Sequence, residues 1–307
     1  MEHPLNINIV EQLLTGPSLE KDLYHYTSSE GLLGIIQSQT LHCSHIYFMN
    51  DYEENLNLWR HFFAYLNKWE TREKDAVNFI KVVRNEFKHW AVLSKEKISL
   101  DIFEHFKIDD YLLYVLSFSH IEDDLSQWRA YTSNSFGFSL KFNFNENFIS
   151  QQSSLIDSEV SANYTCKILI KDCVYSTKEK EKILGGLMEY TFKQFKRAGQ
   201  DWHNELFFNL LTLNIFFKNE KFECEKECRI AILPFPNSEL TDFKKGKSFL
   251  IPYVKMDIPF NILKEVCVGP SPFPTHSIAS VKMFLKKYEN KLGTISVNTS
   301  KIPFRSW

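Results

Sequence analysis

The stretch LYHYTSSEGLLGII, residues 23–36, is the part of the sequence from which the fold is best worked out. Residues 23–27 are rich in β-favouring side chains and predict a short strand. Ser28 or Ser29 can then cap a helix whose leucines and isoleucines form one apolar face. His25 is therefore expected near the end of a strand, beside the start of a helix. There it could donate a hydrogen bond to a ligand hydroxyl, or it could be a buried histidine bonded to a neighbouring carbonyl.

The composition is that of a soluble globular protein. Of the 307 residues, 44% are hydrophobic and 24% are charged, and the 27 phenylalanines predict an interior rich in aromatic rings. The formal charge of −2 gives no overall attraction to nucleic acid or to an acidic membrane. No stretch has the roughly 20 apolar residues that span a bilayer, and the polar residues 1–20 do not resemble a secretory signal. We therefore expect a cytoplasmic protein with no membrane partner.

The six cysteines form no regular framework, so free thiols in a reducing compartment are expected. Cys224 and Cys228 are four residues apart, and HCSH at 42–45 adds possible ligands. No C-x-x-C pair accompanies them, so the sequence predicts no metal site.

The remaining pattern predicts an α+β protein. Helical periodicity dominates residues 52–110 and 178–217, and the charged run KEKEK at 178–182 is expected to be solvated. Apolar or alternating runs predict further strands at 41–44, 111–119, 137–142, 167–175, 228–233, 249–254, 263–268 and 295–297. Because there is no internal repeat and no convincing linker, we expect residues 1–307 to form one domain with helical insertions at about 52–110 and 178–217.

Three features follow one another along the predicted strands. His25 comes first, WRAY at 128–131 follows a central strand, and ECEKE at 223–227 leads into a late strand. Taken singly, each has a simpler explanation, because Tyr131 could be a core residue and the acidic run a solvated surface.

Their order resembles an uncharacterised, mainly bacterial domain family related to the ADP-ribosyltransferases. That family carries a Y-H-Y-T-S opening, an F-N-D segment, an S-F-S…W-x-x-Y…G-F centre, an E-x-E-x-R element and an S-x-I-P-[YF]-R ending. The corresponding segments here are 24–28, 49–51, 117–119, 128–131, 137–138, 225–229 and 300–305. Met49 replaces the usual Phe, and Cys228 stands where Trp is common. The resemblance extends over nearly the whole chain but is weak between the motifs.

The resemblance implies an ADP-ribosyltransferase-like fold, with a split mixed or antiparallel sheet and helical insertions. In the His-Tyr-Glu branch of that superfamily, a histidine holds the NAD ribose, a tyrosine stacks on nicotinamide and a glutamate binds the ribose 2′-hydroxyl. The matching residues are His25, Tyr131 and Glu227, with Glu225 and Glu223 as competing acids. The implied NAD-binding residues are His25, Tyr26, Thr27, Asn50, Ser119, Trp128, Arg129 and Tyr131.

The chemistry favours the same residue types. Breaking the nicotinamide–ribose bond builds positive charge on the ribose, as in glycoside cleavage. A carboxylate such as Glu227 stabilises that charge as it develops, and the ring of Tyr131 or Trp128 could hold nicotinamide. Glu225 lies on the same face as Glu227 if the segment is extended, so it could orient the acceptor nucleophile.

Two arginines are candidates for contacting the NAD pyrophosphate. Arg129 follows the central strand, and Arg229 lies within a late strand. Arg229 could equally form a structural ion pair with Glu227.

The expected function is that of an NAD-dependent ADP-ribosyltransferase, with NAD as substrate and a protein or nucleic acid as acceptor. By resemblance alone, its role would be that of a bacterial toxin or anti-phage effector, with an antitoxin or sensor protein as a possible partner. Two alternatives are an NAD glycohydrolase and a non-catalytic nucleotide- or nucleic-acid-binding module.

Overall fold

The structure is a computed structural model, which describes residues 8–16, 22–49, 54–69, 75–88, 112–132, 136–144, 148, 167–197, 202–235, 241–246 and 248–303. Asn50, predicted to contact NAD, lies outside the described residues, as do Asp51 and the end of the C-terminal motif at 304–305.

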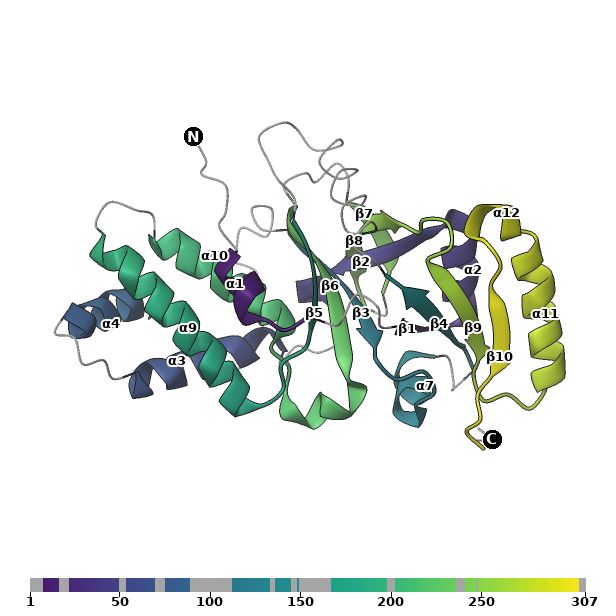
Figure 1. Cartoon of the computed structure of the whole chain (residues 1–307), viewed down its shortest axis with the longest axis horizontal. Helices are drawn as coiled ribbons and strands as arrows, with labels where there is room; N and C mark the ends of the chain where they lie inside the picture. The colour runs from purple at the N-terminus through teal and green to yellow at the C-terminus, as the bar shows by residue number, and fades with distance from the viewer. Residues whose placement is uncertain are drawn as a thin grey trace.

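The chain has an α+β fold built on one ten-stranded sheet (Figure 1). The strand order is β10-β9-β4-β1-β3-β2-β8-β7, with β6 paired to β3 and β5 paired to β6. Most pairs are antiparallel, and the parallel β9–β10 pair makes the sheet mixed. The strands are β1 Asp22–Thr27, β2 Thr40–His45, β3 Leu112–Ser119, β4 Phe138–Asn143, β5 Lys167–Asp172, β6 Glu227–Phe235, β7 Asp242–Lys245, β8 Leu250–Asp257, β9 Leu263–Val268 and β10 Ser296–Thr299. The predicted α+β class is confirmed. Strand β7 was not predicted, because DFKK has no apolar alternation.

The helices lie on both faces of the sheet, and several of them gather at one end of the molecule (Figure 1). They are α1 Asn8–Leu13, α2 Ser29–Ser38, α3 Glu54–Lys68, α4 Asp75–Glu86, α7 Leu125–Tyr131, α9 Thr177–Lys196, α10 Trp202–Phe216, α11 Pro274–Lys286 and α12 Glu289–Leu292, with 3-10 helices η1 Ile46–Phe48 and η3 Glu220–Glu225. Among these described helices, none has both the length and the apolar content to cross a membrane.

The strand and helix predicted from residues 23–36 are confirmed as β1 and α2. The hydroxyl of Ser28 caps α2 by accepting a hydrogen bond from the Gly31 amide at 3.2 Å. Leu32 and Ile36 are buried against the sheet.

Strand β3 is the centre of the sheet. One of its edges pairs with β6 from Leu112 to Ser119. Its other edge pairs with two strands at different points, with β1 at Ser119 and with β2 at Val115 and Tyr114. The sheet therefore divides on this edge of β3, and β1 and β2 continue in separate groups of strands.

One face of β3, β5 and β6 is covered by a group of helices, which lies at the left in Figure 1. Helices α1, α3, α4, α9 and α10 form this layer, and four of them fall within the predicted helical insertions. The KEKEK run begins α9 as expected, but the prediction that it is solvated is wrong for Lys180. That side chain is buried and donates hydrogen bonds to the Lys218 carbonyl at 2.5 Å and to Oδ1 of Asn57 at 3.3 Å.

The opposite face of the sheet holds a second apolar core. Residues 114, 116 and 118 of β3 and 228, 230 and 232 of β6 point into it, together with apolar residues of α2 and α11. Strand alternation therefore assigns Ser119, Glu227 and Arg229 to the helical face, and Phe118 and Cys228 to the second core.

Candidate functional site

Helix α7 covers the end of the helical face next to β1. Asp124 caps it by accepting hydrogen bonds from two backbone amides of its first turn, at 2.8 and 3.0 Å. The buried Trp128 ring meets the Tyr26 ring edge to face, with 4.7 Å between centroids. The Tyr26 hydroxyl donates to the Ile121 carbonyl at 2.9 Å and accepts from the Asp124 amide at 3.1 Å. Tyr26 and Trp128 therefore hold α7 on the sheet.

Asp123 joins α7 to the C-terminal motif. Its Oδ1 accepts hydrogen bonds from Nε1 of Trp128 and from Oγ of Ser300, both at 2.7 Å, and its Oδ2 accepts from the Lys301 amide at 2.8 Å. A Cβ on Gly269 would lie 3.0 Å from the Trp128 ring, so the indole is enclosed by backbone as well. Trp128, predicted to contact NAD, is instead a fully buried support of α7.

Two acids of the E-x-E-x-R motif meet two cations below α7. Nζ of Lys218 donates to Oε2 of Glu227 at 2.5 Å and also forms an ion pair with Oε2 of Glu225. Nε and Nη2 of Arg229 donate to the two carboxylate oxygens of Glu227 at 2.7 and 3.1 Å. Nη1 of Arg229 donates to the Ile215 carbonyl of α10 at 2.6 Å. We call Lys218, Glu225, Glu227 and Arg229 the carboxylate cluster. The structural ion pair considered for Arg229 is thus present.

The electrostatics of Glu227 follow from these neighbours. Burial alone raises the pKa of its carboxyl, but the attraction of Arg229 and then of Lys218 outweighs burial and lowers the pKa to about 2. Glu227 is therefore ionised at neutral pH. Its side chain is almost fully buried and both oxygens accept hydrogen bonds, so it is poorly placed to contact a ligand directly.

Glu225 is the more accessible of the two acids and lies beside Tyr131. The Tyr131 hydroxyl is 3.4 Å from each oxygen of the Glu225 carboxylate, and 41% of Tyr131 is exposed. Burial of the phenol and the nearby Glu225 charge raise the pKa of Tyr131. Oγ of Ser119 donates to the Glu225 carbonyl at 2.8 Å, and Nε2 of Gln127 donates to the same oxygen at 3.5 Å. Strand β3 and helix α7 thus fix the backbone that carries Glu225.

His25 lies on the other face of the sheet. Tyr24 pairs with Ser119, which pairs with Glu227, so Tyr24 shares the face of Glu227 and His25 points to the second core. Nδ1 of His25 is 3.0 Å from the Ser117 carbonyl, and its ring lies 5.7 Å from that of Phe118. This is the carbonyl-bonded arrangement considered above, and it does not bring His25 to the carboxylate cluster.

The other predicted residues are dispersed. Thr27 is buried beneath two glycines, because a Cβ on Gly31 would meet its hydroxyl and a Cβ on Gly137 its carbonyl. Arg129 is exposed on α7. Glu223 is exposed in η3 and pairs with Lys226 at 3.1 Å, so the structure separates it from Glu225 and Glu227.

Two residues of the site were missed from the sequence. Lys218 belongs to a charged run at 218–227 that looks solvated, and nothing in its pattern indicates burial. Asp123 directly precedes Asp124, the residue that caps α7. Since a helix needs only one capping acid, the adjacent pair was a signal that Asp123 has another role.

Residues 127–230 match the model of DUF2971, described as a protein of unknown function. The match covers about a third of the chain and includes Trp128, Tyr131 and the E-x-E-x-R element. No curated protein and no solved structure matches the chain. The match agrees with the resemblance to an uncharacterised domain family, and the relation to ADP-ribosyltransferases stays a prediction.

Proposed function

We propose that this protein is an NAD-dependent ADP-ribosyltransferase that modifies a macromolecule, with its reaction centre at Tyr131 and Glu225. The observation that carries the proposal is the pairing of a half-exposed aromatic ring with the less buried of the two acids, Glu225. Tyr131 exposes 41% of its surface, and its hydroxyl lies 3.4 Å from both Glu225 oxygens. The resemblance to the His-Tyr-Glu branch supports the choice of NAD as substrate.

The reaction needs a negative charge near the ribose as the nicotinamide bond breaks. A fixed carboxylate stabilises the oxocarbenium-like transition state without reorganising at that moment. Glu225 is held in this way, because its carbonyl accepts from Ser119 and its carboxylate pairs with Lys218. The ring of Tyr131 offers a face on which nicotinamide can stack.

The two acids have different tasks in this proposal. Glu225 faces the ligand, whereas the buried Glu227 fixes Lys218 and Arg229 and so positions Glu225 through Lys218. This assignment departs from the sequence-based preference for Glu227, and the reason is burial. His25 takes no part, since it lies on the opposite face.

Turnover of NAD labelled in its ADP-ribose half tests the proposal, with bacterial protein and nucleic acid supplied as acceptors. We expect label on a macromolecule, and a loss of about 100-fold or more in Glu225→Gln, as for removal of one electrostatic stabiliser. Glu223→Gln is the matched control, because that acid is exposed and lies two residues away.

Three outcomes would contradict the proposal. Release of free ADP-ribose without transfer would assign the site to an NAD glycohydrolase. Binding of intact NAD would assign it to a non-catalytic module. Undiminished transfer by Glu225→Gln would remove Glu225 from the reaction centre, whereas a loss in Glu227→Gln alone would restore Glu227 as the catalytic acid.

A further inference from the structure

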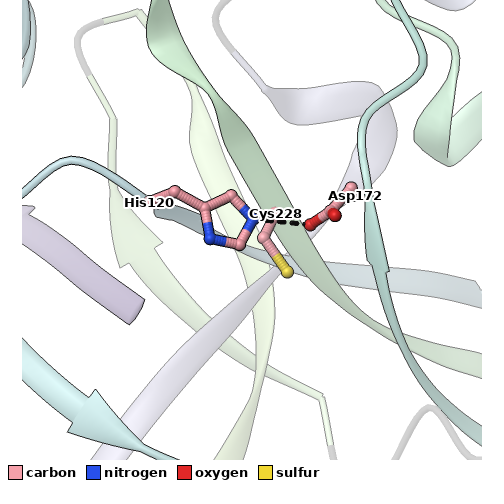
Figure 2. Close-up of side chains that lie close together, drawn as sticks. All are labelled: His120, Asp172 and Cys228. Atoms are coloured by element: carbon pink, nitrogen blue, oxygen red, sulfur yellow. Dashed lines mark hydrogen bonds and ion pairs between the residues drawn. The ribbon is translucent and has the colours of Figure 1, made fainter. Parts of the chain in front are cut away.

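A second group of reactive side chains lies on the other face of the sheet from the carboxylate cluster. Cys228 of β6 pairs with Asp172 at the end of β5 on one side and with Phe118 of β3 on the other. His120 follows β3, and its amide donates to the Lys226 carbonyl at 3.0 Å, which extends the β3–β6 pairing. His120 is thus two residues beyond Phe118 and shares the face of Cys228. Figure 2 shows the three side chains converging, Asp172 from β5, Cys228 from β6 and His120 from the residue after β3.

The atoms that can bind a metal are close together in this group. Nε2 of His120 is 2.6 Å from Oδ1 of Asp172. One nitrogen, one carboxylate oxygen and the Cys228 sulfur all lie within 4.8 Å of one another. Cys228 is fully buried, whereas the side chains of His120 and Asp172 are 26% and 35% exposed. The sulfur therefore forms the floor of the group, and the other two ligands form its solvent-facing rim.

We propose that His120, Asp172 and Cys228 bind a divalent transition-metal ion, with Zn²⁺ as the best match. The donor set of one imidazole nitrogen, one carboxylate oxygen and one thiolate suits Zn²⁺, which takes all three types, whereas Mg²⁺ and Ca²⁺ take oxygen ligands. Three protein ligands leave one position for water or another ligand, as in catalytic rather than structural zinc sites.

The present separations need only small side-chain movements to accept the ion. Tetrahedral zinc at bond lengths of about 2.0–2.3 Å places its donor atoms about 3.4 Å apart. The His120–Asp172 contact would open from 2.6 Å, and the sulfur would approach from within 4.8 Å. The Cys228 thiol gives up its proton to solvent when the metal binds.

A nucleophilic role for Cys228 is the less favoured use of the same residues. Its sulfur is buried, so a substrate carbonyl has no access to it. In addition, Nε2 of His120 is hydrogen-bonded to Asp172, so it is not placed to take a proton from the Cys228 thiol. A metal ion would instead be bound first by His120 and Asp172, whose side chains are 26% and 35% exposed.

The proposed metal site shares strand β6 with two residues of the carboxylate cluster, Glu227 and Arg229. Cys228 lies between Glu227 and Arg229, whose side chains point to the opposite face. The Cys173 amide next to Asp172 donates to the Glu227 carbonyl at 2.9 Å. A bound metal would therefore brace β5 and β6 directly behind the carboxylate cluster, whatever reaction that cluster performs.

Metal binding to the full chain tests the proposal without any activity assay. The protein is stripped with a chelator, dialysed against Zn²⁺ alone, and its metal content is measured by atomic spectroscopy. We expect one equivalent of Zn²⁺. With Co²⁺ as a probe, we expect a thiolate-to-cobalt charge-transfer band in the near ultraviolet.

Variants assign the ligands. His120→Ala, Asp172→Asn and Cys228→Ser should each weaken Zn²⁺ binding at least tenfold, and Cys228→Ser should also abolish the charge-transfer band. Cys224→Ser is the control for an exposed thiol and Cys43→Ser for a buried one, and both should bind as the parent does.

Substoichiometric zinc in the parent, or unchanged binding in His120→Ala and Asp172→Asn, would overturn the site. These two side chains are partly exposed, so their replacement should leave the fold intact, as far-ultraviolet circular dichroism would verify. A charge-transfer band that persists in Cys228→Ser and disappears in Cys224→Ser would move the metal to another thiol.

Discussion

Replacement of Lys218 by methionine should destabilise the protein by about 3 kcal/mol. The Lys218 side chain is 4% exposed and forms ion pairs with Glu225 and Glu227, whose side chains are 13% and 6% exposed. Breaking a buried ion pair typically costs about 3–5 kcal/mol, because a charge is left without its partner. We expect the lower end of that range, since Glu227 keeps its two hydrogen bonds from Arg229.

A double-mutant cycle makes this expectation specific. With Lys218 gone, two carboxylates face each other without the cation between them, so Glu225→Gln should recover about 1 kcal/mol in the Lys218→Met background. In the parent background, the same Glu225→Gln change should destabilise. This change of sign is what distinguishes a shared ion pair from a general loss of packing.

Urea unfolding followed by tryptophan fluorescence measures all four free energies of the cycle. Lys221→Met is the control, because that lysine is exposed in the same segment and its replacement should stay within about 0.5 kcal/mol of the parent. A loss of less than about 1 kcal/mol in Lys218→Met, or no coupling with Glu225, would refute the buried bridge.

Three further changes have definite expected results. Burial lowers the pKa of Lys180 to about 8, so the unfolded state binds its proton more tightly. The free energy of unfolding of the parent, minus that of Lys180→Met, should therefore rise by about 3 kcal/mol between pH 8 and 10.5. A difference that does not change with pH would contradict this. Gly137→Ala should lower the free energy of unfolding by about 2–3 kcal/mol in urea, since the new Cβ would lie 2.4 Å from the Thr27 carbonyl. Ser28→Ala removes the cap to the Gly31 amide, for an expected loss of about 1 kcal/mol by the same measurement.

Local pattern was enough to predict β1, α2 and β3. A strand of β-favouring residues followed by a capping serine and an apolar helical face has few other solutions, and the structure has that arrangement at residues 22–38. The continuous apolar run at 112–119 likewise became a strand with neighbours on both edges. These elements depend on residues close in sequence, so a single chain carries enough information.

The sequence could not predict in the same way which face of the sheet a side chain lies on, or whether a charged side chain is buried. Lys218 looked solvated because a charged residue has the same sequence pattern whether water or a carboxylate surrounds it. It reaches Glu225 and Glu227 because η3 and the left-handed Lys226, with φ of 43°, turn the chain back on itself. His25 was placed with Glu227 by resemblance, but its face depends on the register between β1 and β3, which pairing across nearly a hundred residues decides.

Through the contacts of Asp123, residues 300–303 hold α7 in place on the sheet. Ser300 and Lys301 bond to the same carboxylate that holds Trp128, and Ile302 packs against the aromatic layer beneath α7. A purification tag or fusion partner attached after residue 303 would lie next to the segment that supports the helix carrying Tyr131. Tags for work on this protein are therefore better placed at the N-terminal end, since α1 packs on α9 and α10 (Figure 1).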